Sequence, residues 1–143
     1  MARRQRGSTQ NSLAQDGSAQ LRLPASGVTV RVEVAASARS RTRGLLGRDG
    51  VEGGLLLVPA SGVHTLGMRF SIDVAYLRRD FTVLAVRTMP PGRIGLPRLR
   101  ARMVLEAAAG AMSAWGLRPG DRLELVPREG TQEQDRNTTG TRS

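Results

Sequence analysis

Seven residues in strict alternation, Val28-Thr-Val-Arg-Val-Glu-Val34, decide how this chain folds. Valine occupies every second position, and Thr29, Arg31 and Glu33 stand between the valines. Because successive side chains of a β-strand point to opposite faces, this stretch has one apolar face and one polar face. We therefore expect a half-buried strand here, packed on a β-rich core.

Short apolar runs downstream repeat this signal. They predict strands at 54–58, 72–77, 81–87, 103–107 and 123–126 and an extended piece at 63–66. The runs at 72–77 and 81–87 are separated by a turn and form a plausible hairpin, whereas the proline-rich segment 88–99 predicts an irregular loop. Many short strands joined by turns favour a mainly β fold, either a sandwich or a partly closed barrel.

One or two short helices complete the expected fold. Ser37 can cap the N-terminus of a helix that ends at Gly44 or Gly47. Residues 108–115 can form a helical turn or two that Gly116 closes.

The two ends of the chain differ in composition from the middle. Residues 1–20 contain one large apolar side chain after Met1, namely Leu13, and residues 127–143 contain none. Such segments cannot bury enough surface to offset the entropy of ordering them. The composition therefore predicts disordered tails at 1–20 and 127–143 around a single compact domain at 21–126.

The composition excludes several classes of function. The chain has 143 residues and a formal charge of +10, every basic residue is arginine, and cysteine is absent. Without lysine or cysteine there can be no P-loop lysine, Schiff base, thiol nucleophile or cysteine-ligated metal. With one histidine and no metal-loop spacing among the acids, we expect neither a metal site nor a cofactor.

The positive charge raises the question of nucleic acid. Residues 21–126 hold sixteen arginines and eight acids, so +8 of the charge lies on the expected domain. However, the chain has four aromatic residues in all, which leaves no platform for base stacking, and no nucleic-acid motif is present. Polyanion binding is therefore a third choice, and an arginine-only composition is also typical of GC-rich coding.

We expect no targeting signal from this sequence. No apolar stretch follows the arginines near the N-terminus, and no run approaches the roughly 18 apolar residues of a membrane span. The sequence predicts a cytoplasmic protein without a membrane span, and it identifies no protein partner.

Several motifs occur in an order typical of one family. They are Arg43-Gly-Leu-Leu-Gly-Arg48, Gly54-Leu-Leu-Leu57, His64-Thr-Leu-Gly-Met-Arg-Phe-Ser-Ile-Asp73, Val104-Leu-Glu-Ala107 and Gly116-Leu-Arg-Pro-Gly-Asp121. Together they resemble the bacterial and archaeal family called domain of unknown function 192, over about residues 28–126. The resemblance implies a compact β-rich fold of distorted jelly-roll type and no settled reaction. An aromatic residue and a lysine that many members carry ahead of the aspartate are missing here, where Val63–Met68 stand instead.

Two carboxylates, Asp73 and Glu106, stand inside apolar strands. A carboxylate on the inner face of a strand must be paired or hydrogen-bonded, or it stays neutral. Structural ion pairs with arginines are the simplest expectation, and a pocket in which arginines bind a small anionic ligand is the functional one. A two-carboxylate acid–base pair is a further alternative. The candidate ligand-binding residues are Arg43, Arg48, His64, Arg69, Asp73 and Glu106.

His64 is the single candidate for catalysis. It could act as a general base beside Ser61 or Thr65, although a lone histidine is more often a hydrogen-bonded structural residue. The sequence therefore favours a small binding or accessory module over an enzyme. The alternative from another class is a hydrolase that uses His64 with Asp73 or Glu106.

Overall fold

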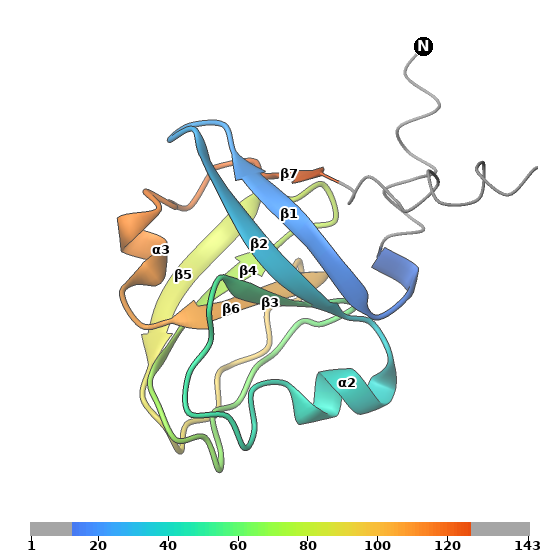
Figure 1. The fold of residues 1–143 in the computed structure, drawn as a ribbon, viewed down its shortest axis with the longest axis vertical. Coiled ribbons are helices and arrows are strands. Elements are labelled where there is room, and N and C mark those ends of the chain that lie inside the picture. The colour runs from blue at the N-terminus through green and yellow to red at the C-terminus, as the bar shows by residue number, and fades with distance from the viewer. Residues whose placement is uncertain (1–12, 127–143) are drawn as a thin grey trace, which may run out of the picture.

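The structure is a computed structural model that describes residues 13–126 and is mostly β (Figure 1). Seven strands form one sheet in the order β5-β4-β6-β3-β2-β1-β7. The strands are β1 (Gly17–Leu23), β2 (Val28–Ala35), β3 (Gly54–Leu57), β4 (Ile72–Leu77), β5 (Val83–Met89), β6 (Met103–Ala108) and β7 (Glu124–Val126). Two short helices, α2 (Ala38–Arg43) and α3 (Ala111–Ala114), accompany them. Within the described residues no helix is long and apolar enough to cross a membrane.

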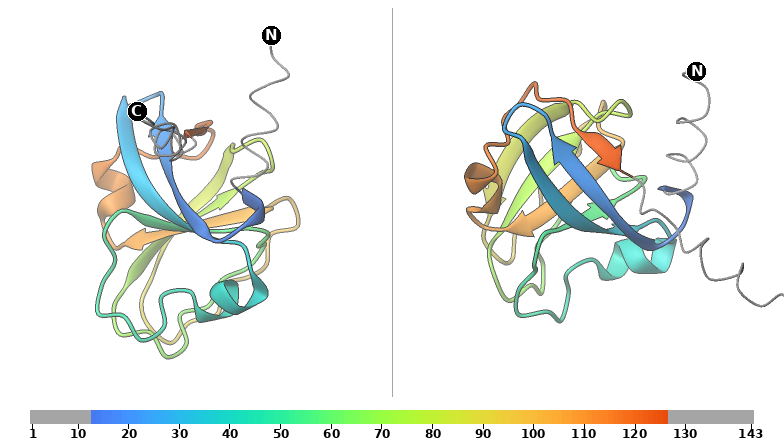
Figure 2. Two further views of the ribbon diagram at one scale, coloured as in Figure 1. Left: turned by 45° about the vertical axis from the view of Figure 1, so that its right-hand side comes forward. Right: turned by 45° about the horizontal axis from the view of Figure 1, so that its top comes forward.

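The sheet curls into a half-barrel whose two edge strands approach one another at one end (Figure 2). Adjacent strands are antiparallel except for β2 and β3, which run parallel. The chain just ahead of β7 bonds to the start of β5, where the Val83 N–H donates to the Asp121 carbonyl and the Leu123 N–H donates to the Phe81 carbonyl. Because β7 itself pairs with β1, this segment links the two edges of the sheet.

Each face of the sheet carries its own apolar cluster. The inner face of the half-barrel is filled by side chains such as Leu21, Val32, Leu56 and Leu105. The outer face carries a second cluster, which includes Leu45, Leu57, Val74 and Val104. Helix α2 and the segment after it lie over this second face (Figure 1). The central strands are therefore buried on both sides, which explains their continuous apolar sequences.

Most of the expected elements are present. The alternating stretch 28–34 is β2, and its alternate valines Val30, Val32 and Val34 are buried as the period predicted. Ser37 caps α2, since its hydroxyl accepts from the Ser40 N–H at 3.1 Å. Gly44 ends the helix with a φ of 47°. The expected β-rich fold with short helices is confirmed, in the form of a single curled sheet.

The chain is already ordered ahead of residue 21, where the sequence predicts the domain to start. Strand β1 already begins at Gly17 and pairs with β2 over its whole length. Asp16 ties this strand to α2, because its carboxylate accepts from the Ala36 and Ser37 N–H groups and from the Ser37 and Ser40 hydroxyls. These four hydrogen bonds hold the pKa of Asp16 well below its usual range. The rest of the two expected tails, 1–12 and 127–143, lies outside the described residues.

Candidate functional site

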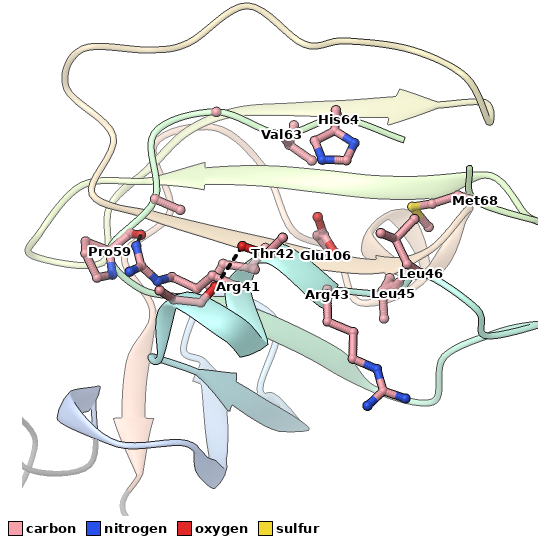
Figure 3. A pocket seen from close by; sticks show the side chains of 15 residues that line it. Arg41, Thr42, Arg43, Leu45, Leu46, Pro59, Val63, His64, Met68 and Glu106 are labelled. Atoms are coloured by element: carbon pink, nitrogen blue, oxygen red, sulfur yellow. Dashed lines mark hydrogen bonds between the residues drawn. The ribbon is translucent and has the colours of Figure 1, made fainter. Parts of the chain in front are cut away.

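A cavity of about 300 Å³ lies on the outer face of the sheet, between α2 and the segment that follows β3 (Figure 3). Its wall combines apolar side chains with several polar ones. The lining residues are Ala38, Arg41, Thr42, Arg43, Gly44, Leu45, Leu46, Leu57, Pro59, Ala60, Gly62, Val63, His64, Met68 and Glu106. Concave, largely apolar sites with a few polar groups are the usual form of small-molecule sites.

Glu106 is the polar group at the base of this cavity. It stands in the middle of β6, opposite Leu55 of β3 and Val74 of β4, and is only 5% exposed. Its carboxyl points into the space beneath His64 (Figure 3). Among the described residues, no side chain or backbone group forms a hydrogen bond or an ion pair with it. Burial raises the pKa of Glu106 to about 7, because a low dielectric disfavours the charged form.

The two arginines of α2 that line the cavity do not neutralise this carboxyl. The Arg41 guanidinium donates to the Pro59 carbonyl at 2.8 Å and to the Ser37 carbonyl at 3.4 Å. Arg43 is exposed, and its side chain extends away from Glu106 (Figure 3). The carboxyl thus faces the cavity without a protein cation directed at it.

Gly44 leaves the carboxyl accessible. A Cβ built on this glycine would lie 4.0 Å from Glu106 Oε2, so a longer side chain would cover the oxygen. The residue also has a φ of 47°, a left-handed conformation that favours glycine. One glycine therefore both ends α2 and keeps the wall thin beside the carboxyl.

His64 lies at the opposite side of the cavity from α2. Its backbone forms an isolated antiparallel bridge with Ile94, and its side chain is exposed and faces the cavity (Figure 3). Loop 90–102 supports this segment, since the Thr65 N–H donates to the Arg93 carbonyl and the Gly95 N–H to the Val63 carbonyl. The expected extended piece at 63–66 therefore exists as a single bridge.

The structure brings three of the six candidate residues together, Arg43, His64 and Glu106. Arg48 lies elsewhere, in a two-bond ion pair with Glu33 at 2.9 and 3.3 Å. Arg69 pairs with Asp49 at 2.9 Å on the surface. The six candidates are therefore not gathered in one patch. The expected ion pairs between these arginines and the two strand carboxylates do not form either.

Asp73 has a different position and a structural environment. Its register partner is Ala107, whereas Glu106 is opposite Val74, so the two carboxylates point to opposite faces of the sheet. Asp73 is 3% exposed and accepts from the Thr88 hydroxyl at 2.7 Å, the Gly110 N–H at 2.9 Å and the Met112 N–H at 3.1 Å. It thereby caps α3 from β4, which leaves no geometry for a two-carboxylate pair.

The sequence matches the model of a known protein family. The family model DUF192, described as "Uncharacterized ACR, COG1430", matches residues 21–125. The chain belongs to this family. Within the DUF192 fold seen here, three motifs converge on the cavity: the segment 43–46, His64 with Met68, and Glu106 of the Val104-Leu-Glu sequence.

Curated relatives carry the family name UPF0127. UPF0127 protein PYRAB11210 of Pyrococcus abyssi is 29% identical over 101 residues, which cover 67% of this chain and 86% of the relative. UPF0127 protein PH1112 of Pyrococcus horikoshii is 34% identical over 64 residues, covering 45% of this chain and 56% of the relative. The chain thus spans little more than half the length of that archaeal relative.

Two solved structures share the DUF192 fold. The crystal structure of R01717 from Sinorhizobium meliloti 1021, a candidate transcription regulator, has a TM-score of 0.67 and 26% identity and covers 78% of this chain and 95% of its own. A protein of unknown function from Novosphingobium aromaticivorans DSM 12444 has a TM-score of 0.65 and 22% identity, with 77% and 85% covered. The second likeness concerns the fold alone.

Sequence reasoning missed the apolar part of the site. Leu45, Leu57 and Met68 line the cavity, but apolar side chains in short strands and turns read as ordinary core. Gly44 was expected only as a helix end. Within residues 13–126 no cluster of three histidine, cysteine, aspartate or glutamate side chains could hold a metal ion.

Proposed function

We propose that this DUF192 chain is a small-molecule binding module whose ligand occupies the cavity at Glu106. The observation that carries this proposal is the side chain of Glu106, a residue that is 5% exposed, whose carboxyl is directed into a cavity and has no partner among the described residues. A buried ionisable group without a partner lowers stability, and proteins ordinarily pair it. A bound ligand would supply the missing partner.

The anionic ligand expected from the sequence has less support than binding itself. Arg48 and Arg69 are engaged with Glu33 and Asp49 away from the cavity. Arg43 could reach an anion at the rim only by changing its direction, and an ionised Glu106 would repel that anion. The geometry therefore favours a ligand that complements the carboxyl.

A fragment screen tests the binding proposal. Ala38 lines the cavity from the exposed start of α2, and Ala114 is an exposed residue on the distant α3. We expect fragments that shift backbone amide resonances around the cavity of the wild type to lose at least ten-fold in affinity, about 1.4 kcal/mol, in Ala38→Trp. The same fragments should bind Ala114→Trp as they bind the wild type. A collection in which no fragment distinguishes the two variants would contradict a binding role for this cavity.

A hydrolase is the second candidate, because His64 and Glu106 line one cavity. A carboxyl whose pKa is raised to about 7 by burial suits general acid–base work near neutral pH. Asp73 cannot orient His64 in such a mechanism, since its oxygens bind Thr88 and the start of α3. If the chain is a hydrolase, a screen of ester, amide and glycoside substrates should show turnover that falls by at least about 100-fold in His64→Ala. Turnover that is absent, or unchanged in the variant, removes this candidate.

A further inference from the structure

We infer that the ligand of this cavity carries a primary ammonium group on a short apolar stem, with the ammonium bound by the Glu106 carboxylate. This inference rests on the proposed binding function and adds the chemical class of the ligand. It follows from the charges around Glu106, the nature of the cavity wall and the access to the carboxyl.

The groups that face Glu106 do not compensate the negative charge of its ionised carboxylate. From the sheet, its neighbours Leu55 and Val74 are apolar. From α2, Arg41 donates to two backbone carbonyls and Arg43 extends away. From the segment after β3, His64 is the one ionisable side chain in the lining. A ligand cation would therefore be the first full positive charge directed at this carboxylate.

The apolar part of the cavity wall indicates the kind of stem that carries the ammonium group. Leu45, Leu57, Val63 and Met68 surround the space beside the carboxyl and offer no hydrogen bonds from their side chains. An aliphatic stem can bury against them, and each added methylene that fits should tighten binding roughly three- to four-fold. A highly polar molecule would place its hydrogen-bonding groups against these apolar side chains, and a bulky one would not fit between them.

Other ligand classes fit the carboxyl less well. A carboxylate ligand would place two negative charges together in a poorly solvated space. A carbonyl ligand could accept a hydrogen bond from Glu106, but only when the carboxyl is in its neutral, protonated form. An ammonium provides three donors and the opposite charge, and Gly44 leaves Oε2 accessible to it. Its binding stabilises the ionised carboxyl and displaces the proton into solvent.

Four probes with the same carbon chain length distinguish these classes: n-butylamine, butyrate, butyramide and butan-1-ol. Binding is measured from NMR chemical-shift changes at the cavity at about pH 5.5 and about pH 8. We expect n-butylamine to bind the wild type at least ten-fold more tightly at the higher pH, because Glu106 is then ionised, and to bind more tightly than the other three probes.

Variants assign that pH dependence to Glu106. Glu106→Gln keeps the size of the side chain and should remove both the pH dependence and the preference for the amine. Glu52→Gln alters an exposed glutamate outside the cavity lining and should behave as the wild type. Because the His64 imidazole is a second ionisable group at the cavity, His64→Gln must keep the dependence if Glu106 causes it.

The outcomes separate this inference from the proposed function. If n-butylamine fails to bind at the higher pH, or binds Glu106→Gln equally well, the ligand class is wrong. If butyramide or butyrate binds instead, more weakly as the pH rises, Glu106 acts as a proton donor and the cavity remains a binding site. If no probe and no fragment responds to the Ala38→Trp change, the binding function itself fails.

Discussion

Replacing Asp73 by alanine should lower the free energy of unfolding by about 3–5 kcal/mol, the largest loss expected for any polar side chain in this fold. The carboxylate accepts three hydrogen bonds, from the Thr88 hydroxyl and from the Gly110 and Met112 N–H groups. Met112 is fully buried, and its amide would have no acceptor in the variant. The start of α3 would then separate from β4.

Chemical denaturation, monitored by circular dichroism, measures this loss of unfolding free energy. Thr88→Val is the matched control, because it removes one of the three hydrogen bonds and should cost only about 1 kcal/mol. Asp73→Asn should fall between the two, since an amide oxygen can still accept from the two backbone N–H groups but forms weaker hydrogen bonds than a charged carboxylate. A loss in Asp73→Ala no larger than that in Thr88→Val would show that α3 does not depend on this cap.

The contrast between Asp73 and Glu106 shows what sequence patterns can determine. Each carboxylate stands in an apolar strand, so the sequence alone gives no reason to assign the two different roles. Their relative orientation depends on the register between β4 and β6, in which Asp73 is opposite Ala107 and Val74 is opposite Glu106. A shift of one residue exchanges the two faces of a strand. Register is a long-range property, so the strands could be predicted and the grouping of their side chains could not.

The alternating valines of β2 were predictable because the signal is local and strong. Strand β1 was missed because its exposed face is polar and it follows a polar segment. Its buried positions Ala19, Leu21 and Leu23 nevertheless alternate, which is the same signal in a weaker form. Asp16 acts through four contacts with residues twenty or more positions away, and no local pattern indicates them.

The arginines were placed less well than the strands. Arg48 and Arg69 could reach many positions from their backbone sites, and the local sequence does not indicate that they pair with Glu33 and Asp49. Surface ion pairs of this kind contribute roughly 0–1 kcal/mol, so little in the sequence constrains which partner is used. At the candidate site the ionisable group that matters is instead the Glu106 carboxylate. Its burial and its register in β6 determine where it points.

The Glu106→Gln variant should be more stable than the wild type at pH 8 and above, by about 3 kcal/mol. Burial raises the pKa of this carboxyl from 4.5 to about 7. Between those two values the folded protein holds a proton that the unfolded chain has released. Wild-type stability therefore falls as the pH rises from about 4.5 to about 7, and it is constant with respect to this group above that range. Glutamine does not ionise, so its variant lacks this fall.

The measurement is the difference in unfolding free energy between the variant and the wild type, taken at several pH values from about 4 to about 9. Subtraction removes the titration of the other groups, including the hydrogen-bonded Asp16. The difference should be near zero at the acidic end and reach its plateau above neutral pH, whereas Glu52→Gln should give a flat line. A flat line for Glu106→Gln would mean that the carboxyl ionises in the folded protein without cost. A carboxylate without such a cost would have no need of the ligand cation that the cavity is proposed to bind.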